Sequence, residues 1–206
     1  RRNGKMVLDT DDGEPGLLLT LSLGTSLGGT MSDQVSGTAE GSQTDRAGEY
    51  AEDAGFVLGG SLEWPLASFL SVGGSVWYLP AIALTQSTGD TRVGANGDLS
   101  EVDLNAVARL YLPSGPYSFY LAGEAGLAIV LPPTGAAEEF DVAFFGFDYT
   151  VGVGVIYNLV PSFRVMSEVR YQNIQTSRDI SGGEFDLTQN LTGSRLLVTF
   201  GVALGG

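Results

Sequence analysis

Apolar and polar residues alternate one by one through most of this chain, and no other feature of the sequence constrains the fold as strongly. In residues 101–112, for example, Val102 and Leu104 alternate with Glu101 and Asp103. Because successive side chains of a β-strand point to opposite faces of a sheet, such a segment is expected to be a strand with one apolar and one polar face. The pattern recurs in eight segments, which are 17–28, 54–64, 69–84, 101–112, 118–131, 148–157, 163–172 and 194–204.

The connections between these segments alternate in length. Eight antiparallel strands joined in this way place all short turns at one end of a barrel and all long loops at the other. We therefore expect residues 17–206 to form a single all-β domain, an eight-stranded antiparallel up-and-down barrel, preceded by an acidic tail at 1–16. The short connections contain turn-forming Pro, Gly, Asn and Ser and cover 64–68, 113–117 and 158–162, whereas the long, polar ones cover about 29–53, 85–100, 132–147 and 177–193.

Two barrel architectures share this pattern, and they differ in which face meets water. A soluble lipocalin-like barrel buries its apolar face, whereas a transmembrane barrel turns it toward lipid. The polar face here consists mainly of Gly, Ser, Ala and Thr, and Lys5 in the tail is the only lysine of the chain. The charged fraction of the chain is 17%, below the roughly 25% of soluble domains. Small polar-face residues suit a narrow lumen, so the composition favours a transmembrane barrel.

Aromatic residues gather at the strand ends, where the two water–lipid interfaces of a transmembrane barrel are expected. An aliphatic band separates the two groups, which supports the transmembrane interpretation. Trp64, Phe69, Tyr117, Phe119, Tyr157 and Phe163 flank the short turns, and Tyr78, Phe144, Phe145, Phe147, Tyr149 and Tyr171 lie toward the long loops.

With these alternating strands, three tight turns, four long loops and paired aromatic girdles, residues 17–204 resemble the small eight-stranded outer-membrane barrels of the OmpA/OmpX type. The resemblance implies short turns and termini in the periplasm of a Gram-negative cell and long loops outside it. Barrels of this family typically end in an aromatic residue that the insertion machinery reads. This chain departs from that pattern, since its last segment carries Phe200 but ends in Gly206.

Charged residues on the polar face are expected to point into the lumen. They form a predicted network of four acids and four bases, with Glu101 and Asp148 nearer the mouth. All four bases are arginines, whose planar guanidinium group pairs well with carboxylates in a confined space. Buried charges are tolerated when they are paired, so we interpret the network as a balanced structural plug. Its members are Glu63, Asp103, Arg109, Glu124, Arg164, Glu168, Arg170 and Arg195.

Composition also argues against several classes of function. The formal net charge of −14 disfavours a nucleic-acid partner, because such partners are bound by basic patches. The chain contains no Cys and no His, which removes thiolate metal sites, cysteine nucleophiles and the commonest general base. We therefore expect no enzymatic activity and no cofactor.

The long loop at 29–53 is acidic and raises the question of a metal site. Carboxylate oxygens are the ligands that Ca²⁺ prefers, and the loop offers Asp45, Glu49, Glu52 and Asp53. We favour a solvated acidic surface and keep a calcium site as the alternative.

Together these features predict a non-enzymatic outer-membrane barrel with a plugged lumen. Its acidic loops are expected to serve a structural or interaction role within a larger envelope assembly, with outer-membrane lipid and an envelope protein as partners. A channel for a small solute or a hydrophobic molecule is the alternative, and a soluble lipocalin-like carrier is the second alternative.

Overall fold

Strands make up almost all of the structure, a computed structural model that describes residues 16–86, 92–93, 99–114, 117–132, 143–160, 162–182 and 185–205. In these ranges no helix is long and apolar enough to cross a membrane. Residues 1–15 of the predicted acidic tail lie outside the described residues. The strands are β1 (Leu18–Ala39), β2 (Ser42–Glu52), β3 (Gly55–Ala67), β4 (Leu70–Ile82), β5 (Leu84–Gln86), β6 (Arg92–Val93), β7 (Leu99–Ser114), β8 (Tyr117–Leu131), β9 (Phe144–Val160), β10 (Phe163–Gly182) and β11 (Phe185–Leu204).

Eight of these strands form a closed antiparallel ring in the order β1–β3–β4–β7–β8–β9–β10–β11, which β11 closes by pairing with β1. Each of the eight segments predicted as strands falls on one strand of the ring, which confirms the eight-stranded up-and-down barrel. The short turns are tighter than predicted, because the strands continue into them. For example, β3 ends at Ala67 and β4 begins at Leu70.

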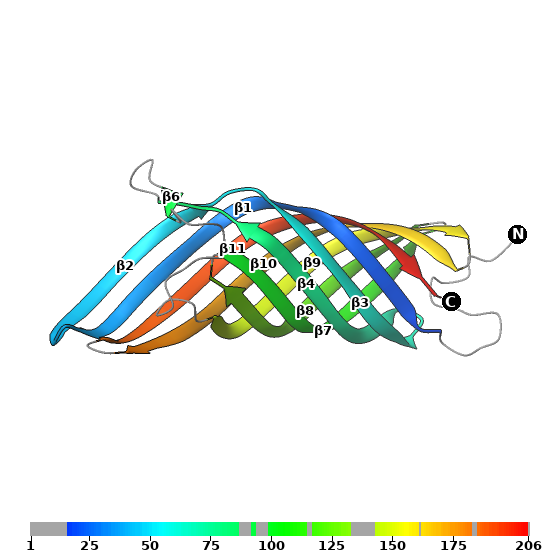
Figure 1. Ribbon diagram of the computed structural model, residues 1–206. Coiled ribbons are helices and arrows are strands. Elements are labelled where there is room, and N and C mark those ends of the chain that lie inside the picture. Colours follow the sequence, from blue (N-terminus) through cyan, green and yellow to red (C-terminus); the bar gives the residue numbers. More distant parts are fainter. Residues whose placement is uncertain are drawn as a thin grey trace, which may run out of the picture.

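The ring strands are tilted relative to the barrel axis (Figure 1). A path of paired residues that starts at Thr192 on β11 and runs through β10, β9, β8, β7, β4, β3 and β1 returns to β11 at Val202. This displacement along the strand is the shear that a barrel of tilted strands requires. A line of paired residues followed once around the ring therefore moves ten residues along β11, toward the end that carries the chain termini.

The apolar face of the ring strands points outward and the polar face points into the lumen. On β11, Phe200 is 58% exposed, whereas Arg195 and Thr199 are 2% exposed. The same contrast holds on β8, where Leu121 is 51% exposed and Glu124 is 4% exposed. An outward apolar band with buried inward charges is the arrangement of a transmembrane barrel and the reverse of a soluble carrier.

Two hairpins extend the barrel wall beyond the ring, at the end away from the chain termini (Figure 1). Here β1 pairs with β2 along 29–39, and β10 pairs with β11 up to Gly182 and Phe185. We call this four-stranded sheet, β2–β1–β11–β10, the extension. The prediction of long polar loops at 29–53 and 177–193 is therefore wrong, because these residues continue the strands with polar residues on the outer face.

The extension reverses the polarity of the strands that it continues. Its inner face carries the buried residues Met31, Ile174 and Leu191, while its outer face is polar. On β1 the reversal occurs at a β-bulge between Ser26 and Gly29, which shifts the alternation by one residue. Gly28 at this bulge has a φ of 96°, a backbone conformation that favours glycine.

The turn of the β1–β2 hairpin is short. Glu40 and Gly41 both have positive φ angles, 51° and 74°, as in the two-residue turns that match the twist of a hairpin. The remaining predicted long loops, 85–100 and 132–147, lie largely outside the described residues. Their described parts include β5 and β6, where β5 joins the edge of β2 through Glu52 and Leu84.

Candidate functional site in the barrel lumen

All eight residues of the predicted charge network lie inside the ring, where their exposed fractions range from 0% to 5%. The alternation of a β-strand explains this placement, because every second residue points into the lumen and each of the eight occupies such a position. The structure groups the charges into a lower cluster nearer the chain termini and an upper cluster nearer the extension. Arg164 is buried near the short-turn end of β10.

Arg109 on β7 is the centre of the lower cluster. Its Nη1 atom contacts Oε1 of Glu63 on β3, and its Nη2 atom lies 3.7 Å from Oε2 of Glu168 on β10. Glu63 also accepts hydrogen bonds from Ser61 and Ser71, each at 2.6 Å. One arginine thus joins opposite walls of the barrel, and small hydroxyl residues satisfy its carboxylate partner.

Arg170 on β10 forms the second ionic centre of the lower cluster. Its Nη2 atom lies 2.9 Å from Oε2 of Glu124 on β8, and its guanidinium group lies 3.6 Å from the ring centroid of Trp77. The indole Nε1 of Trp77 and the hydroxyl of Ser75 donate to the same carboxylate at 2.9 and 2.7 Å. Trp77 therefore holds both members of the ion pair, through a cation–π contact and a hydrogen bond.

The upper cluster contains one arginine and four carboxylates. Arg195 on β11 lies 2.7 Å from Glu101 Oε2 and 3.3 Å from Glu52 Oε2. Asp103 forms no such ion pair with the described residues, and it accepts a hydrogen bond from Gln172 Nε2 at 2.8 Å. The same nitrogen lies 3.2 Å from Glu101 Oε1 and 3.1 Å from Asp148 Oδ2.

The buried charges do not balance, contrary to the sequence-based prediction. Among the described residues, seven carboxylates but only four arginines are buried. The prediction left three acids out of the balance, because it placed Glu101 and Asp148 nearer the mouth and assigned Glu52 to a loop. Strand tilt brings the first two into the lumen, and β2 turns Glu52 inward. The excess of negative charge lies in the upper cluster.

Sequence reasoning also missed several neutral members of the network. Gln172 and Trp77 lie on the polar parity of their strands, so the alternation alone contained the signal that they point inward. Tyr120 donates a hydrogen bond to Glu168 Oε2 at 2.7 Å, and its ring lies 5.9 Å from that of Tyr111. The polar face otherwise consists of small residues, so its large aromatic residues were the signal for side chains that contact the lumen charges.

Apolar layers flank the charges on both sides along the barrel axis. Toward the chain termini, Tyr111, Tyr120, Ala122, Ile156 and Met166 form one buried cluster. Toward the extension, a larger cluster includes Leu79, Ile82, Val130 and Phe144. The prediction that Phe144 belongs to an outer girdle is therefore wrong, since this side chain is 3% exposed.

Glycines make room for the large inward side chains. A Cβ atom on Gly154 would lie 2.2 Å from a ring carbon of Tyr120, and one on Gly59 would lie 2.1 Å from the ring of Trp77. A Cβ on Gly152 would approach Glu168 Oε1 to 2.5 Å. The small residues of the polar face are thus the space into which the aromatic rings and charges pack.

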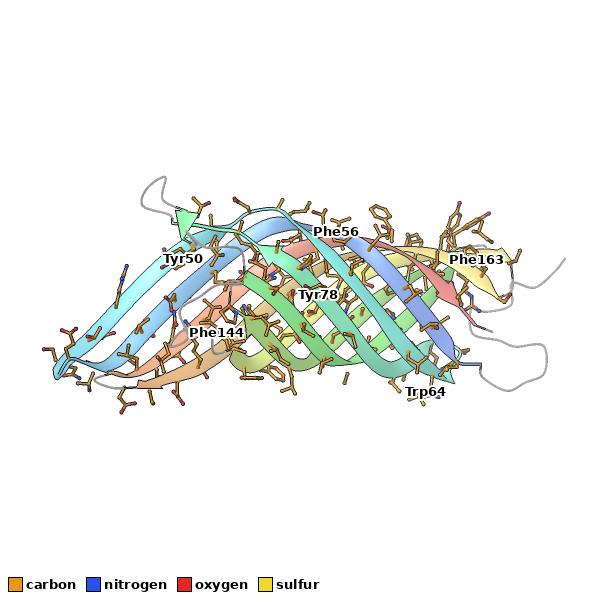
Figure 2. The ribbon with its side chains drawn as sticks, in the orientation of Figure 1. Tyr50, Phe56, Trp64, Tyr78, Phe144 and Phe163 are labelled. Atoms are coloured by element: carbon orange, nitrogen blue, oxygen red, sulfur yellow. The ribbon has the colours of Figure 1, made fainter. Side chains whose placement is uncertain are left out.

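The other predicted site residues are distributed over the outer surface. Apart from Phe144, the predicted girdle residues lie on the outer face, and Figure 2 shows Trp64 and Phe163 at the end that carries the termini. Tyr157 and Phe163 are partly exposed. The remaining girdle residues are 39–61% exposed, namely Trp64, Phe69, Tyr78, Tyr117, Phe119, Phe145, Phe147, Tyr149 and Tyr171.

The four candidate calcium ligands do not come together. Asp45 and Glu49 point outward from β2, whereas Glu52 points into the lumen toward Arg195. Asp53 follows the end of β2, and its backbone amide donates to Ala83 O at 2.9 Å. In the described ranges, no group of three or more acidic residues is arranged to hold a metal ion.

The fold is that of the small outer-membrane β-barrels. No protein-family model and no curated protein matches the chain. Solved structures do match it. OprG, an outer membrane protein from Pseudomonas aeruginosa, is 14% identical with a TM-score of 0.57, over 94% of this chain and 97% of that chain.

Two further structures show the same similarity. Neisserial surface protein A is 14% identical with a TM-score of 0.52, over 93% of this chain and 99% of that one. The outer membrane protease OmpT from Escherichia coli is 12% identical with a TM-score of 0.53, over 93% of this chain and 97% of that one. At these identities the similarity establishes the fold.

Proposed function

We propose that this chain is a non-enzymatic barrel of the bacterial outer membrane whose charged lumen is a closed structural plug. Its biological role lies outside the lumen, in interactions of the extension with a partner in the cell envelope. The termini and the short turns would face the periplasm, and the extension would face the outside of the cell, as is usual for outer-membrane barrels.

The observation that supports a closed lumen is that Arg109 and Arg170 each form an ion pair with a carboxylate on another strand. Each guanidinium group is 1–2% exposed and contacts carboxylates from other strands. An ion or solute would have to displace these pairs and leave charges buried without partners. Breaking a buried pair costs about 3–5 kcal/mol, which favours a plug over an open path.

The chemistry of the lumen supports a non-enzymatic role. The chain has no His and no Cys, and the carboxylates of the lower cluster are engaged with arginines, serines and aromatic donors. One structural neighbour is a protease, so we base this proposal on the residues of this chain and not on the fold.

Planar-bilayer conductance tests the plug. The wild-type barrel is expected to give no steady conductance, whereas Arg109→Ala combined with Arg170→Ala should produce open events, because both cross-lumen contacts are lost. Arg46→Ala is the matched control, since Arg46 is an exposed arginine on β2. A steady wild-type conductance that the double variant abolishes would instead support the alternative function, a channel for small solutes.

A further inference from the structure

The outer face of the extension differs in composition from the outer face of the ring, which is apolar. This face consists of every second residue of 30–38, 43–51, 173–181 and 186–194, and all of these side chains are exposed or half-exposed. It contains Ser, Thr, Asn, Gln, Ala and four acidic residues, with no Lys, no Arg and no aromatic residue. We call it the polar outer face.

A groove of about 330 Å³ crosses the polar outer face on the two rows nearest the ring. Residues from all four strands line it, and three of them, Met31, Tyr50 and Gly193, are buried residues that lie between the outward-facing ones. The volume is at the lower end of the range for small-molecule sites, about 300–1,000 Å³. The wall residues are Thr30, Ser32, Glu49, Asn173, Thr192 and Ser194.

The groove offers both hydrogen-bond donors and acceptors at close spacing. The hydroxyl groups of Thr30 and Ser194 lie 3.3 Å apart, and Ser32 donates to the Thr192 carbonyl at 3.4 Å. The Oδ1 atom of Asn173 is buried at the groove and accepts no hydrogen bond from the described residues. Buried polar atoms normally have a partner, and Asn173 as a whole is half-exposed, so a rotation of its amide would bring this oxygen to a ligand that donates hydrogen bonds.

The position of the groove limits what can fill it. Leu196 and Tyr171, which are 39% and 45% exposed, lie one outward position below Ser194 and Asn173 on the same strands. The groove thus begins where the apolar band ends, at the level of the lipid headgroups. A molecule seated in it stands at the membrane surface beside the barrel wall.

The charge of the groove indicates which kind of lipid headgroup it can bind. Phosphate groups are bound by Arg and Lys, and the polar outer face has neither. Glu49 on the wall and the net charge of −14 further disfavour anions. Hydroxyl, amide and carboxylate groups complement the hydroxyl groups of sugars, each of which both donates and accepts hydrogen bonds.

We propose that the groove binds the uncharged sugar portion of a glycolipid in the outer leaflet that surrounds the barrel. This inference rests on the proposed outer-membrane location, but it does not depend on the lumen being closed. The bound sugar would anchor the extension to the membrane surface through the side chains of four strands.

An NMR titration in phosphatidylcholine nanodiscs tests the proposal, with an uncharged glycolipid, a monohexosyl diacylglycerol, as the probe. Amide resonances of Ser32, Asn173 and Thr192 should shift. The near-isosteric double variant Asn173→Leu/Thr192→Val should weaken binding about tenfold, since it removes hydrogen-bonding groups from the site. The control double variant Thr188→Val/Asn190→Leu lies on the same face farther from the ring and should bind like the wild type.

Three outcomes would overturn the proposal. They are equal affinity of the groove variant and the wild type, equal weakening by the control variant, and the same shifts on titration with phosphatidylglycerol, which carries phosphate without the sugar. If the free hexosylglycerol headgroup, without acyl chains, bound as tightly as the whole glycolipid, the ligand would not need to come from the membrane, which would also contradict the proposal. Heat-modifiable electrophoretic mobility of the same sample shows separately whether the barrel is folded in the membrane. A failure of the proposed barrel can therefore be told apart from a failure of sugar binding.

Discussion

Neutralising one carboxylate of the upper cluster should stabilise the barrel, whereas neutralising one in the lower cluster should destabilise it. Asp103→Asn and Glu63→Gln are the matched pair, because both residues are 0% exposed and both substitutions keep the size of the side chain. The two residues differ in their surroundings. Glu63 contacts Arg109, whereas Asp103 shares the amide of Gln172 with Glu101 and Asp148.

The expected magnitudes follow from this geometry. The oxygens of Asp103, Glu101 and Asp148 lie within 3.2 Å of the Gln172 nitrogen, which places them no more than about 6 Å from one another and within the range of strong like-charge repulsion. At an effective dielectric constant of about 20, each repulsion is about 3 kcal/mol. Arg195 and bound protons offset part of it, so we expect Asp103→Asn to raise the unfolding free energy by about 2 kcal/mol. The asparagine retains an oxygen that accepts from Gln172.

The opposite sign is expected at Glu63. Glu63→Gln leaves Arg109 with Glu168 at 3.7 Å as its nearest ionised partner. Loss of one partner of a buried ion pair typically costs about 3–5 kcal/mol. The two substitutions, each of which removes one negative charge, should therefore differ by more than 5 kcal/mol, or roughly four orders of magnitude in the unfolding equilibrium.

Urea unfolding from phosphatidylcholine vesicles measures both effects, with the fluorescence of the two tryptophans, Trp64 and Trp77, and heat-modifiable mobility as independent signals. The denaturant slopes should match among the three proteins, so that midpoints can be compared. A loss of stability in Asp103→Asn comparable to that in Glu63→Gln would refute the reasoning, because it would mean that the upper carboxylates are as well compensated as the lower ones.

Further predictions concern packing and lipid contact. Gly154→Ala should reduce the unfolding free energy, because its methyl group would collide with the Tyr120 ring. Gly123→Ala, whose methyl group meets no described atom within 4 Å, should be neutral in the same urea titration. Equal effects of the two variants would argue against the packing of Tyr120 on Gly154. Val153→Arg, on the exposed apolar band, should cost about 2–4 kcal/mol, the penalty for Arg near the bilayer midplane. Gln175→Arg, on the polar outer face, should cost little, and equal costs would contradict the boundary between lipid and water.

The ring strands could be predicted from the sequence because lipid imposes a strict alternation on them. A lipid-facing strand carries apolar residues at nearly every outward position, as Leu196, Phe200 and Leu204 do on β11. The inward parity then follows without further information, and it placed Arg109 and Arg170 in the lumen. The local sequence alone therefore indicates both the strands of the ring and the direction in which each of their side chains points.

The extension could not be predicted in the same way, because water makes no comparable demand. Its outward positions are polar, so the apolar alternation is carried only by scattered inward residues such as Met31, Ile174 and Leu191. The bulge between Ser26 and Gly29 also changes the parity on β1, which interrupts the pattern in the sequence. Ser/Thr-rich strands of this kind are easily interpreted as polar loops.

The charge balance of the lumen depends on three-dimensional information that the alternation lacks. Parity shows that Glu101 and Asp148 point inward, but the height of each residue in the lumen depends on strand tilt and register. Glu52 enters the lumen only because β2 pairs with β1, and this pairing was hidden together with the extension. The pairs themselves, such as Arg195 with Glu52 and Glu101, are contacts across the barrel.

The central claim is that one continuous side of each long strand contacts lipid below and water above. The chain has no cysteine, so single-cysteine variants along the outward side of β11 can be labelled without interference. In vesicles, positions 196, 198, 200, 202 and 204 should resist a water-soluble maleimide, and fluorophores attached there in detergent before reconstitution should be quenched by brominated lipid. Positions 188, 190, 192 and 194 should react readily and escape quenching. Uniform reactivity along the whole side of the strand would contradict the account.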